Sequence, residues 1–175
     1  MGGSGRRLAS FSRLGLGVSF AIDVNLLLYA SDAASPHHSE ATRFLERCAT
    51  GSETVCLTWP TVLGYLRIAT HPSIFAQPLS PDEARHNVEA LLELPHVRTL
   101  AEEDGFWDSY LRSTHGMSVR GNLVPDAHIA AILLQHGVRT LYTNDADFRR
   151  FDFLEVRNPL KDGNDSGGRP RRTTR

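Results

Sequence analysis

The sequence contains little cysteine. Two cysteines, Cys48 and Cys56, occur in 175 residues, and their spacing matches neither a CxxC pair nor a zinc site. This pattern is typical of free thiols in a reducing compartment. We therefore expect a cytoplasmic protein.

The chain also lacks an excess of either charge. Its formal net charge is −1, so no global positive field indicates a nucleic-acid partner. A nucleic-acid substrate is still compatible with this value, because a local basic rim around an acidic site would cancel in the sum. No apolar run reaches the length of a membrane span, and we expect no membrane partner.

The length and composition are those of one globular domain. Hydrophobic residues make up 41% of the chain and charged residues 22%, which is ordinary for a soluble protein. We place the domain at residues 20–160. Residues 1–19 are rich in Gly, Ser and Arg and are expected to be a disordered or wrongly started extension, and residues 161–175 a disordered tail.

Apolar segments of strand length alternate with amphipathic segments of helix length. This alternation is typical of an α/β fold with a central parallel sheet flanked by helices. The first strand ends at Asp23, and a turn or helix follows it. The other expected strands are residues 55–58, 96–100, 138–142 and, at an edge, 153–156; the expected helices are 37–48, 59–70, 80–94, 102–114 and 125–136.

Three helix starts have clear local signals. Ser80-Pro81-Asp82-Glu83 combines a serine cap, a proline in the first turn and a glutamate three residues after the cap. Pro60 fits the first turn of the helix 59–70 in the same way, and Pro125 is expected to open the helix that carries Asp126. The apolar residues of the helix 59–70 are expected to face mainly the core: Val62, Leu63, Leu66 and Ile68.

Aspartates gather where the expected strands end. Asp23 ends the first strand, and Asp145 and Asp147 follow the strand 138–142. Asp126 lies in the first turn of the helix that precedes that strand. In a parallel sheet the two strand ends and the start of this helix lie at one edge, where sites of α/β proteins form.

Carboxylates that are brought together repel one another unless a cation lies among them. Mg²⁺ and Mn²⁺ prefer such oxygen ligands and keep bound waters, an arrangement suited to metal-assisted phosphodiester hydrolysis. Taken singly, each aspartate could be only a helix cap or a turn residue. Together on one edge beside Asp23, they favour a metal site.

These residues resemble the PIN-domain nucleases, and most closely the toxin ribonucleases of bacterial VapBC toxin–antitoxin systems. The resemblance covers residues 20–160. The motifs that carry it are Asp23-x-Asn25 after an apolar run, Asp126-Ala127-x-Ile129-Ala130, Thr143-Asn144-Asp145-x-Asp147-Phe148 and, as in a subgroup of these toxins, Leu66-Arg67-Ile68-Ala69-Thr70-His71-Pro72.

The resemblance implies a single PIN-like domain and Mg²⁺- or Mn²⁺-dependent endonucleolytic cleavage of RNA. It also implies a cognate VapB-like antitoxin that neutralises the enzyme, and a homodimer. By position, Asp23 and Asp126 would be the principal metal ligands and Asp145 would complete the acidic cluster. Asp147 would be an outer or second-metal partner, and the supporting polar residues would be Asn25 and Thr143.

One position departs from the pattern of this family. Many PIN nucleases have a glutamate in the helix after the second strand, where this chain has Gly64. The departure puts a full second metal site in doubt, although Glu40 could supply a replacement carboxylate. An alternative is therefore a catalytically weakened PIN domain that binds RNA or protein. A haloacid-dehalogenase-like phosphatase fits less well, because Asn25 cannot act as the general acid that this chemistry requires.

Overall fold

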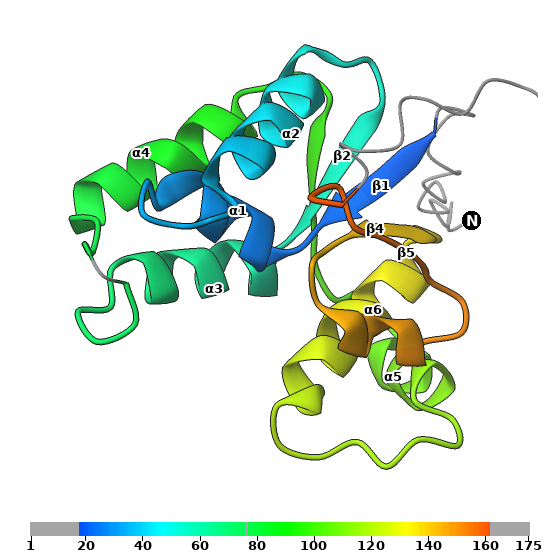
Figure 1. The fold of residues 1–175 in the computed structure, drawn as a ribbon. Coiled ribbons are helices and arrows are strands. Elements are labelled where there is room, and N and C mark those ends of the chain that lie inside the picture. The colour runs from blue at the N-terminus through cyan, green and yellow to red at the C-terminus, as the bar shows by residue number, and fades with distance from the viewer. Residues whose placement is uncertain (1–17, 76, 162–175) are drawn as a thin grey trace, which may run out of the picture.

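A five-stranded parallel sheet forms the centre of the protein. The computed structural model describes residues 18–75 and 77–161, and the sheet has the strand order β3-β2-β1-β4-β5 (Figure 1). The extension and the tail expected from the sequence lie outside the described residues, apart from the bordering residues Val18, Ser19 and Lys161. The strands are β1 (Ser19–Ile22), β2 (Thr54–Thr58), β3 (Val97–Leu100), β4 (Thr140–Tyr142) and β5 (Glu155–Arg157).

Helices fill the connections between the strands, as the alternation in the sequence predicts. Within the described residues, none of them is both long enough and apolar enough to cross a membrane. They are α1 (Val24–Ser31), α2 (His38–Thr50), α3 (Trp59–Ala69), α4 (Pro81–Leu92), α5 (Phe106–Ser113), α6 (Leu123–Gln135) and the 3₁₀ helix η1 (Ala146–Arg150).

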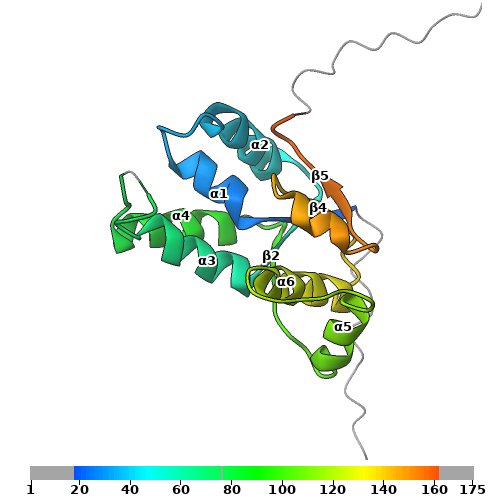
Figure 2. The ribbon, with the colours of Figure 1, turned by 60° about the horizontal axis from the view of Figure 1, so that its bottom comes forward.

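The sheet is covered on both faces. Figure 2 shows α1 to α4 on one side of it and α5 and α6 on the other. Strand β1 divides its side chains between two cores: Phe20 and Ile22 pack under α1 to α4, whereas Ala21 packs against α6. Because both faces of β1 are buried, its residues from Phe20 to Ile22 are all apolar.

The order of the strands reverses beside β1. The chain proceeds from β1 to β2 and β3 on one side, then returns to add β4 and β5 on the other. Ligands of open α/β sheets bind at such a reversal point, outside the carboxyl ends of the strands. The carboxyl ends of β1 and β4 are paired neighbours here, with Ile22 opposite Tyr142. The residues that follow these two strands therefore meet.

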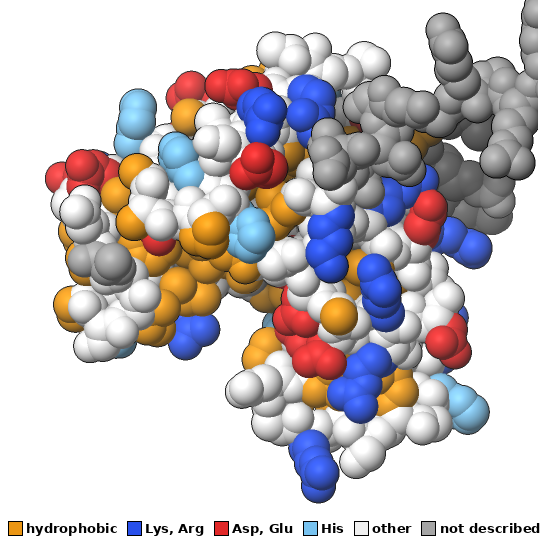
Figure 3. Space-filling view, viewed as in Figure 1, with side chains coloured by type: hydrophobic (Ala, Val, Ile, Leu, Met, Phe, Trp, Pro, Cys, Tyr) orange, Lys and Arg blue, Asp and Glu red, His pale blue; other side chains and the backbone are white. Residues whose placement is uncertain are grey.

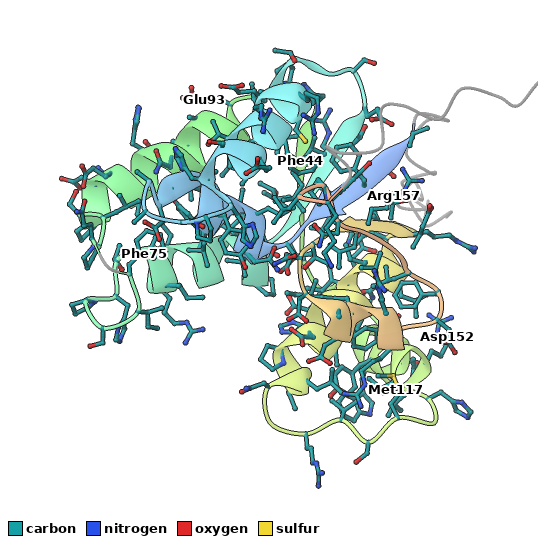
Figure 4. The ribbon with its side chains drawn as sticks, in the orientation of Figure 1. Phe44, Phe75, Glu93, Met117, Asp152 and Arg157 are labelled. Carbon is teal, nitrogen blue, oxygen red and sulfur yellow. The ribbon has the colours of Figure 1, made fainter. Side chains whose placement is uncertain are left out.

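Aromatic contacts fix the end of β4. The ring of Tyr142 lies 5.0 Å from that of Phe20 and 4.9 Å from that of Phe44 on α2, measured between centroids. The guanidinium of Arg157 on β5 lies 6.0 Å from the same ring. Figure 4 labels Phe44 on α2 and Arg157 on β5. These contacts fix the position of Tyr142, the last residue of β4. The polar segment begins at the next residue, Thr143.

Two expectations about the helices are wrong in detail. Helix α6 begins at Leu123 and not at Pro125, because Leu123 and Val124 donate their N–H groups to the carbonyls of Arg120 and Gly121. Pro125 is still within the first turn, where a missing N–H costs nothing. Leu63 is 60% exposed instead of facing the core, since Tyr65 and Ala69 occupy the buried side of α3.

The capping box at the start of α4 is confirmed. Ser80 Oγ accepts from the Glu83 N–H at 3.2 Å, and the Glu83 carboxylate accepts from the Ser80 N–H at 2.8 Å. We predict that Ser80→Ala lowers the free energy of unfolding by about 1 kcal/mol, because this substitution removes the cap. Urea denaturation followed by circular dichroism measures the change. Ser52→Ala, at an exposed serine in a turn, is the matched control and is expected to have no measurable effect.

Candidate active site

Asp23 is a buried carboxylate at the carboxyl end of β1. Its side chain is 4% exposed and caps the N-terminus of α1 by accepting from the Val24 N–H at 2.7 Å. Its other oxygen, Oδ2, accepts from Asn25 Nδ2 and from Thr143 Oγ1, both at 2.6 Å. A buried charge of this kind is tolerated only when its oxygens have partners. Asp23 is therefore both a helix cap and part of a polar network. The sequence alone does not show which of these two roles it has.

Asn25 and Thr143 hold this network together across two strand ends. Asn25 Nδ2 also donates to Thr143 Oγ1 at 2.8 Å, and that hydroxyl accepts from the Asp145 N–H at 2.9 Å. The side-chain oxygen Oδ1 of Asn25 accepts from the Asn144 N–H at 3.2 Å. The segment after β4 is thus tied to the segment after β1. The geometry is consistent with the supporting role that the family resemblance implies for Asn25 and Thr143.

Three further carboxylates converge next to this network. Asp126 comes from the first turn of α6, Asp145 caps η1 directly after β4, and Asp147 lies in the first turn of η1. One oxygen from each lies within 4.8 Å of the others. We call these three residues the carboxylate group. Figure 3 shows acidic side chains gathered at this part of the surface, below the sheet and beside α6.

Asp23 is not part of the carboxylate group as defined by this distance. It is nevertheless near enough that its charge raises the pKa of Asp126, and the charge of Asp145 raises the pKa of Asp23 in turn. Asp147, which the resemblance gives only an outer role, stands with Asp126 and Asp145 instead. The structure therefore brings all four predicted aspartates to one edge of the sheet, with Asp23 deepest.

Burial and repulsion disturb the protonation of this site. The pKa of Asp126 is raised to about 6, first by desolvation and then by the charges of Asp145, Asp23 and Asp147. The pKa of Asp23 is also raised, mainly by burial, although its hydrogen bonds from Thr143 and Val24 oppose the shift. Carboxylates whose mutual repulsion raises a pKa in this way are stabilised by a cation among them.

The donor set fits a small divalent cation. All the side-chain donors of the carboxylate group are oxygens, and the separation of these atoms leaves room for an ion between them. Mg²⁺ and Mn²⁺ prefer such hard ligands and retain waters at the remaining positions. Asp145 is oriented for this role, since its Oδ1 accepts from the Asp147 N–H at 2.8 Å and fixes the turn.

Two residues of the network were missed in the sequence. Asn158 follows β5 and donates from Nδ2 to Asn144 Oδ1 at 2.7 Å, and Tyr29 accepts from Asn144 Nδ2 at 3.4 Å. The sequence indicates Asn144 only as part of its motif. The order of the strands was the signal that could have found Asn158, because β5 ends beside β4.

Gly64 faces the first turn of α1. A Cβ at this position would meet Val24 Cγ2 at 3.8 Å, an ordinary contact, so the fold leaves room for a side chain beside the residue after Asp23. Glu40 is an ion-pair partner of Arg43 on α2, at 2.9 Å, and is not among the residues of the carboxylate group. The geometry gives no support to Glu40 as a replacement ligand.

The comparisons with known proteins agree with this architecture. The profile of the family described as "PIN domain" matches residues 20–154. Ribonuclease VapC48 of Mycobacterium tuberculosis is 43% identical over 143 residues, which is 82% of this chain and 99% of that protein.

Solved structures show the same fold at low sequence identity. VapBC2 from Rickettsia felis, bound to a DNA fragment from its promoter, has a TM-score of 0.59 at 16% identity over 81% of this chain and 98% of that chain. VapC20 of Mycobacterium tuberculosis, described as a sarcin-ricin loop cleaving toxin, has a TM-score of 0.58 at 17% identity, covering 79% and 98%. Because a family profile covers most of the chain, and a relative of 43% identity is matched over 82% of this chain and 99% of its own length, the chain belongs to the PIN domain family, among the VapC ribonucleases.

Proposed function

We propose that this protein is the toxin of a type II toxin–antitoxin system and an endoribonuclease that depends on Mg²⁺ or Mn²⁺. The observation that carries the proposal is the meeting of Asp126, Asp145 and Asp147 beside the buried Asp23. The 43% identity to a relative named ribonuclease VapC48 supports the choice of RNA as substrate.

In this proposal the aspartates hold the ion and the polar residues hold the aspartates. The bound ion would activate a water molecule and neutralise charge on the phosphodiester. Thr143 and Asn25 orient Asp23 by donating to its Oδ2. Asp126 would provide a ligand oxygen from the first turn of α6, and Asp145 would provide one from the turn after β4. Asp147 adds a third, exposed oxygen donor.

A protein partner follows from the same family membership. Structural neighbours such as VapBC2 from Rickettsia felis were solved as toxin–antitoxin pairs, which supports a cognate VapB-like antitoxin that neutralises this enzyme in the cytoplasm. Exposed apolar side chains on α3 and α6 are compatible with such a protein partner or with a second copy of the chain: Trp59, Leu63 and Val124. We therefore retain the homodimer as part of the proposal.

The alternative is a PIN domain that binds RNA or protein without cleaving. Gly64 is the observation in its favour, because it leaves the site one acidic residue short of many PIN nucleases. Four aspartates at one edge argue against it, since a purely binding surface for RNA would gain nothing from such a concentration of negative charge.

Cleavage by the wild type and by Asp126→Asn separates the two functions. We expect induced wild-type protein to arrest bacterial growth and to cut RNA at discrete sites with Mg²⁺ or Mn²⁺ present. Asp126→Asn, which removes one ligand charge without changing shape, should lower cleavage by at least 100-fold. Growth and primer extension on the extracted RNA measure both effects.

Asp152→Asn, at an exposed aspartate outside the carboxylate group, is the control and should cleave normally. Undiminished cleavage by Asp126→Asn would refute the assignment.

The raised pKa of Asp126 gives a second prediction, on stability. Because the folded protein binds this proton more tightly than the unfolded chain does, ionisation of Asp126 destabilises the fold as the pH rises from about 4 through about 6. Without metal, Asp126→Asn should match the wild type at pH 4 and be more stable by about 1 kcal/mol at pH 7. This value allows for screening of a half-exposed carboxylate.

Chemical denaturation at the two pH values measures this difference. Mg²⁺ should then raise the stability of the wild type at pH 7 more than that of Asp126→Asn, because a ligand stabilises only the state that binds it. A difference between the two proteins that is independent of pH would contradict the proposed repulsion.

A further inference from the structure

One cation lies beside the carboxylate group. The guanidinium of Arg150 is 4.0 Å from the carboxylate of Asp147. Among the ion pairs of residues 18–75 and 77–161, this is the one that joins a cation to Asp126, Asp145 or Asp147. Figure 3 shows basic side chains next to the acidic ones on this face. The surroundings of the site are therefore locally mixed in charge.

The 3₁₀ geometry of η1 sets the direction of Arg150. Residues three apart in a 3₁₀ helix lie on the same side of it, so Arg150 shares a side with Asp147. Arg149 shares its side with Ala146 instead. Phe148, 1% exposed, anchors the third side in the core. A single turn thus presents one ligand carboxylate and one guanidinium toward the same place.

The ion pair itself contributes little to stability. Its distance is at the limit for an ion pair, and the side chains of Arg150 and Asp147 are 57% and 64% exposed. Exposed pairs of this kind are worth between nothing and about 1 kcal/mol. The guanidinium can therefore exchange Asp147 for a stronger partner at low cost. A phosphate is such a partner, because its oxygens match the planar fork of arginine in a bidentate arrangement.

We propose that Arg150 binds a backbone phosphate of the RNA beside the phosphodiester that is cleaved. The inference rests on the proposed ribonuclease function and identifies a substrate-binding residue for it. RNA is a polyanion, and the four aspartates of the site repel it. One divalent ion offsets two of these charges, whereas a cation on η1 attracts the adjoining phosphate. Phosphate contacts of this type position the nucleic acid without reading its sequence.

RNA binding by matched arginine variants tests this inference. In the Asp126→Asn background, affinity for a fluorescein-labelled single-stranded RNA of mixed sequence is measured by anisotropy over about 50–200 mM NaCl. Arg150→Ala should weaken binding about 3- to 10-fold and make the slope of log K against log salt shallower by about 0.7, the value for one lost phosphate contact on a single strand. Arg150→Lys should keep the slope.

Arg149→Ala is the control, because it removes the same charge from the neighbouring residue on a different side of η1. It should change the affinity by less than about twofold. Equal losses for Arg149→Ala and Arg150→Ala would indicate general attraction and overturn the inference, as would an unchanged slope for Arg150→Ala. Thermal melting of each variant establishes that it is folded, and Arg150→Gln replaces Arg150→Ala if the alanine variant is not.

Cleavage kinetics distinguish failure of this inference from failure of the proposed function. With otherwise wild-type protein and Mg²⁺, Arg150→Ala should raise KM several-fold and change kcat less. Normal cleavage with an unchanged KM in Arg150→Ala would overturn the role of Arg150 alone. If the wild type cleaves no RNA with either Mg²⁺ or Mn²⁺, the ribonuclease function and the inference that rests on it both fall.

Discussion

The buried carboxylate of Asp23 is the interaction on which the site depends. It stabilises α1 as a cap and fixes Thr143 through a 2.6 Å hydrogen bond, so one side chain joins the ends of β1 and β4. Burial of a charge has a large desolvation cost, which the surrounding donors only partly offset, and the raised pKa of Asp23 reflects this balance. A cation bound at the neighbouring carboxylates would stabilise the ionised form further. Binding of the proposed cation would therefore be coupled to folding at this residue.

The strand order explains why the other aspartates come to the same place. Because β4 pairs with β1 after the chain has completed β2 and β3, residues about 120 positions apart become neighbours: Asn25 and Asn144 are joined by one hydrogen bond. Asp126 reaches the same edge because α6 runs antiparallel to the strand that follows it. No single local motif could assemble this site, but the parallel topology does so.

Much of this arrangement could be predicted from the sequence. A parallel α/β sheet requires that Asp23, Asp145 and the start of the helix with Asp126 share an edge, and the structure agrees. What could not be predicted depends on contacts that periodicity does not contain. Asn158 joins the network only because β5 lies beside β4. The start of α6 at Leu123 depends on carbonyls in the preceding loop, and the exposure of Leu63 depends on which side of α3 Tyr65 occupies.

The distribution of charge shows why a net value says little about a substrate. The formal charge of −1 sums over a chain in which Asp145, Asp147 and Arg150 occur within six residues. In an extended segment such charges would largely cancel in the field that a distant ion experiences. The turn and 3₁₀ helix instead group the two carboxylates with Asp126 and place the guanidinium next to them. Local geometry thus converts a nearly neutral sequence into adjacent regions of opposite sign, and the proposed binding of a phosphodiester together with a cation would use both.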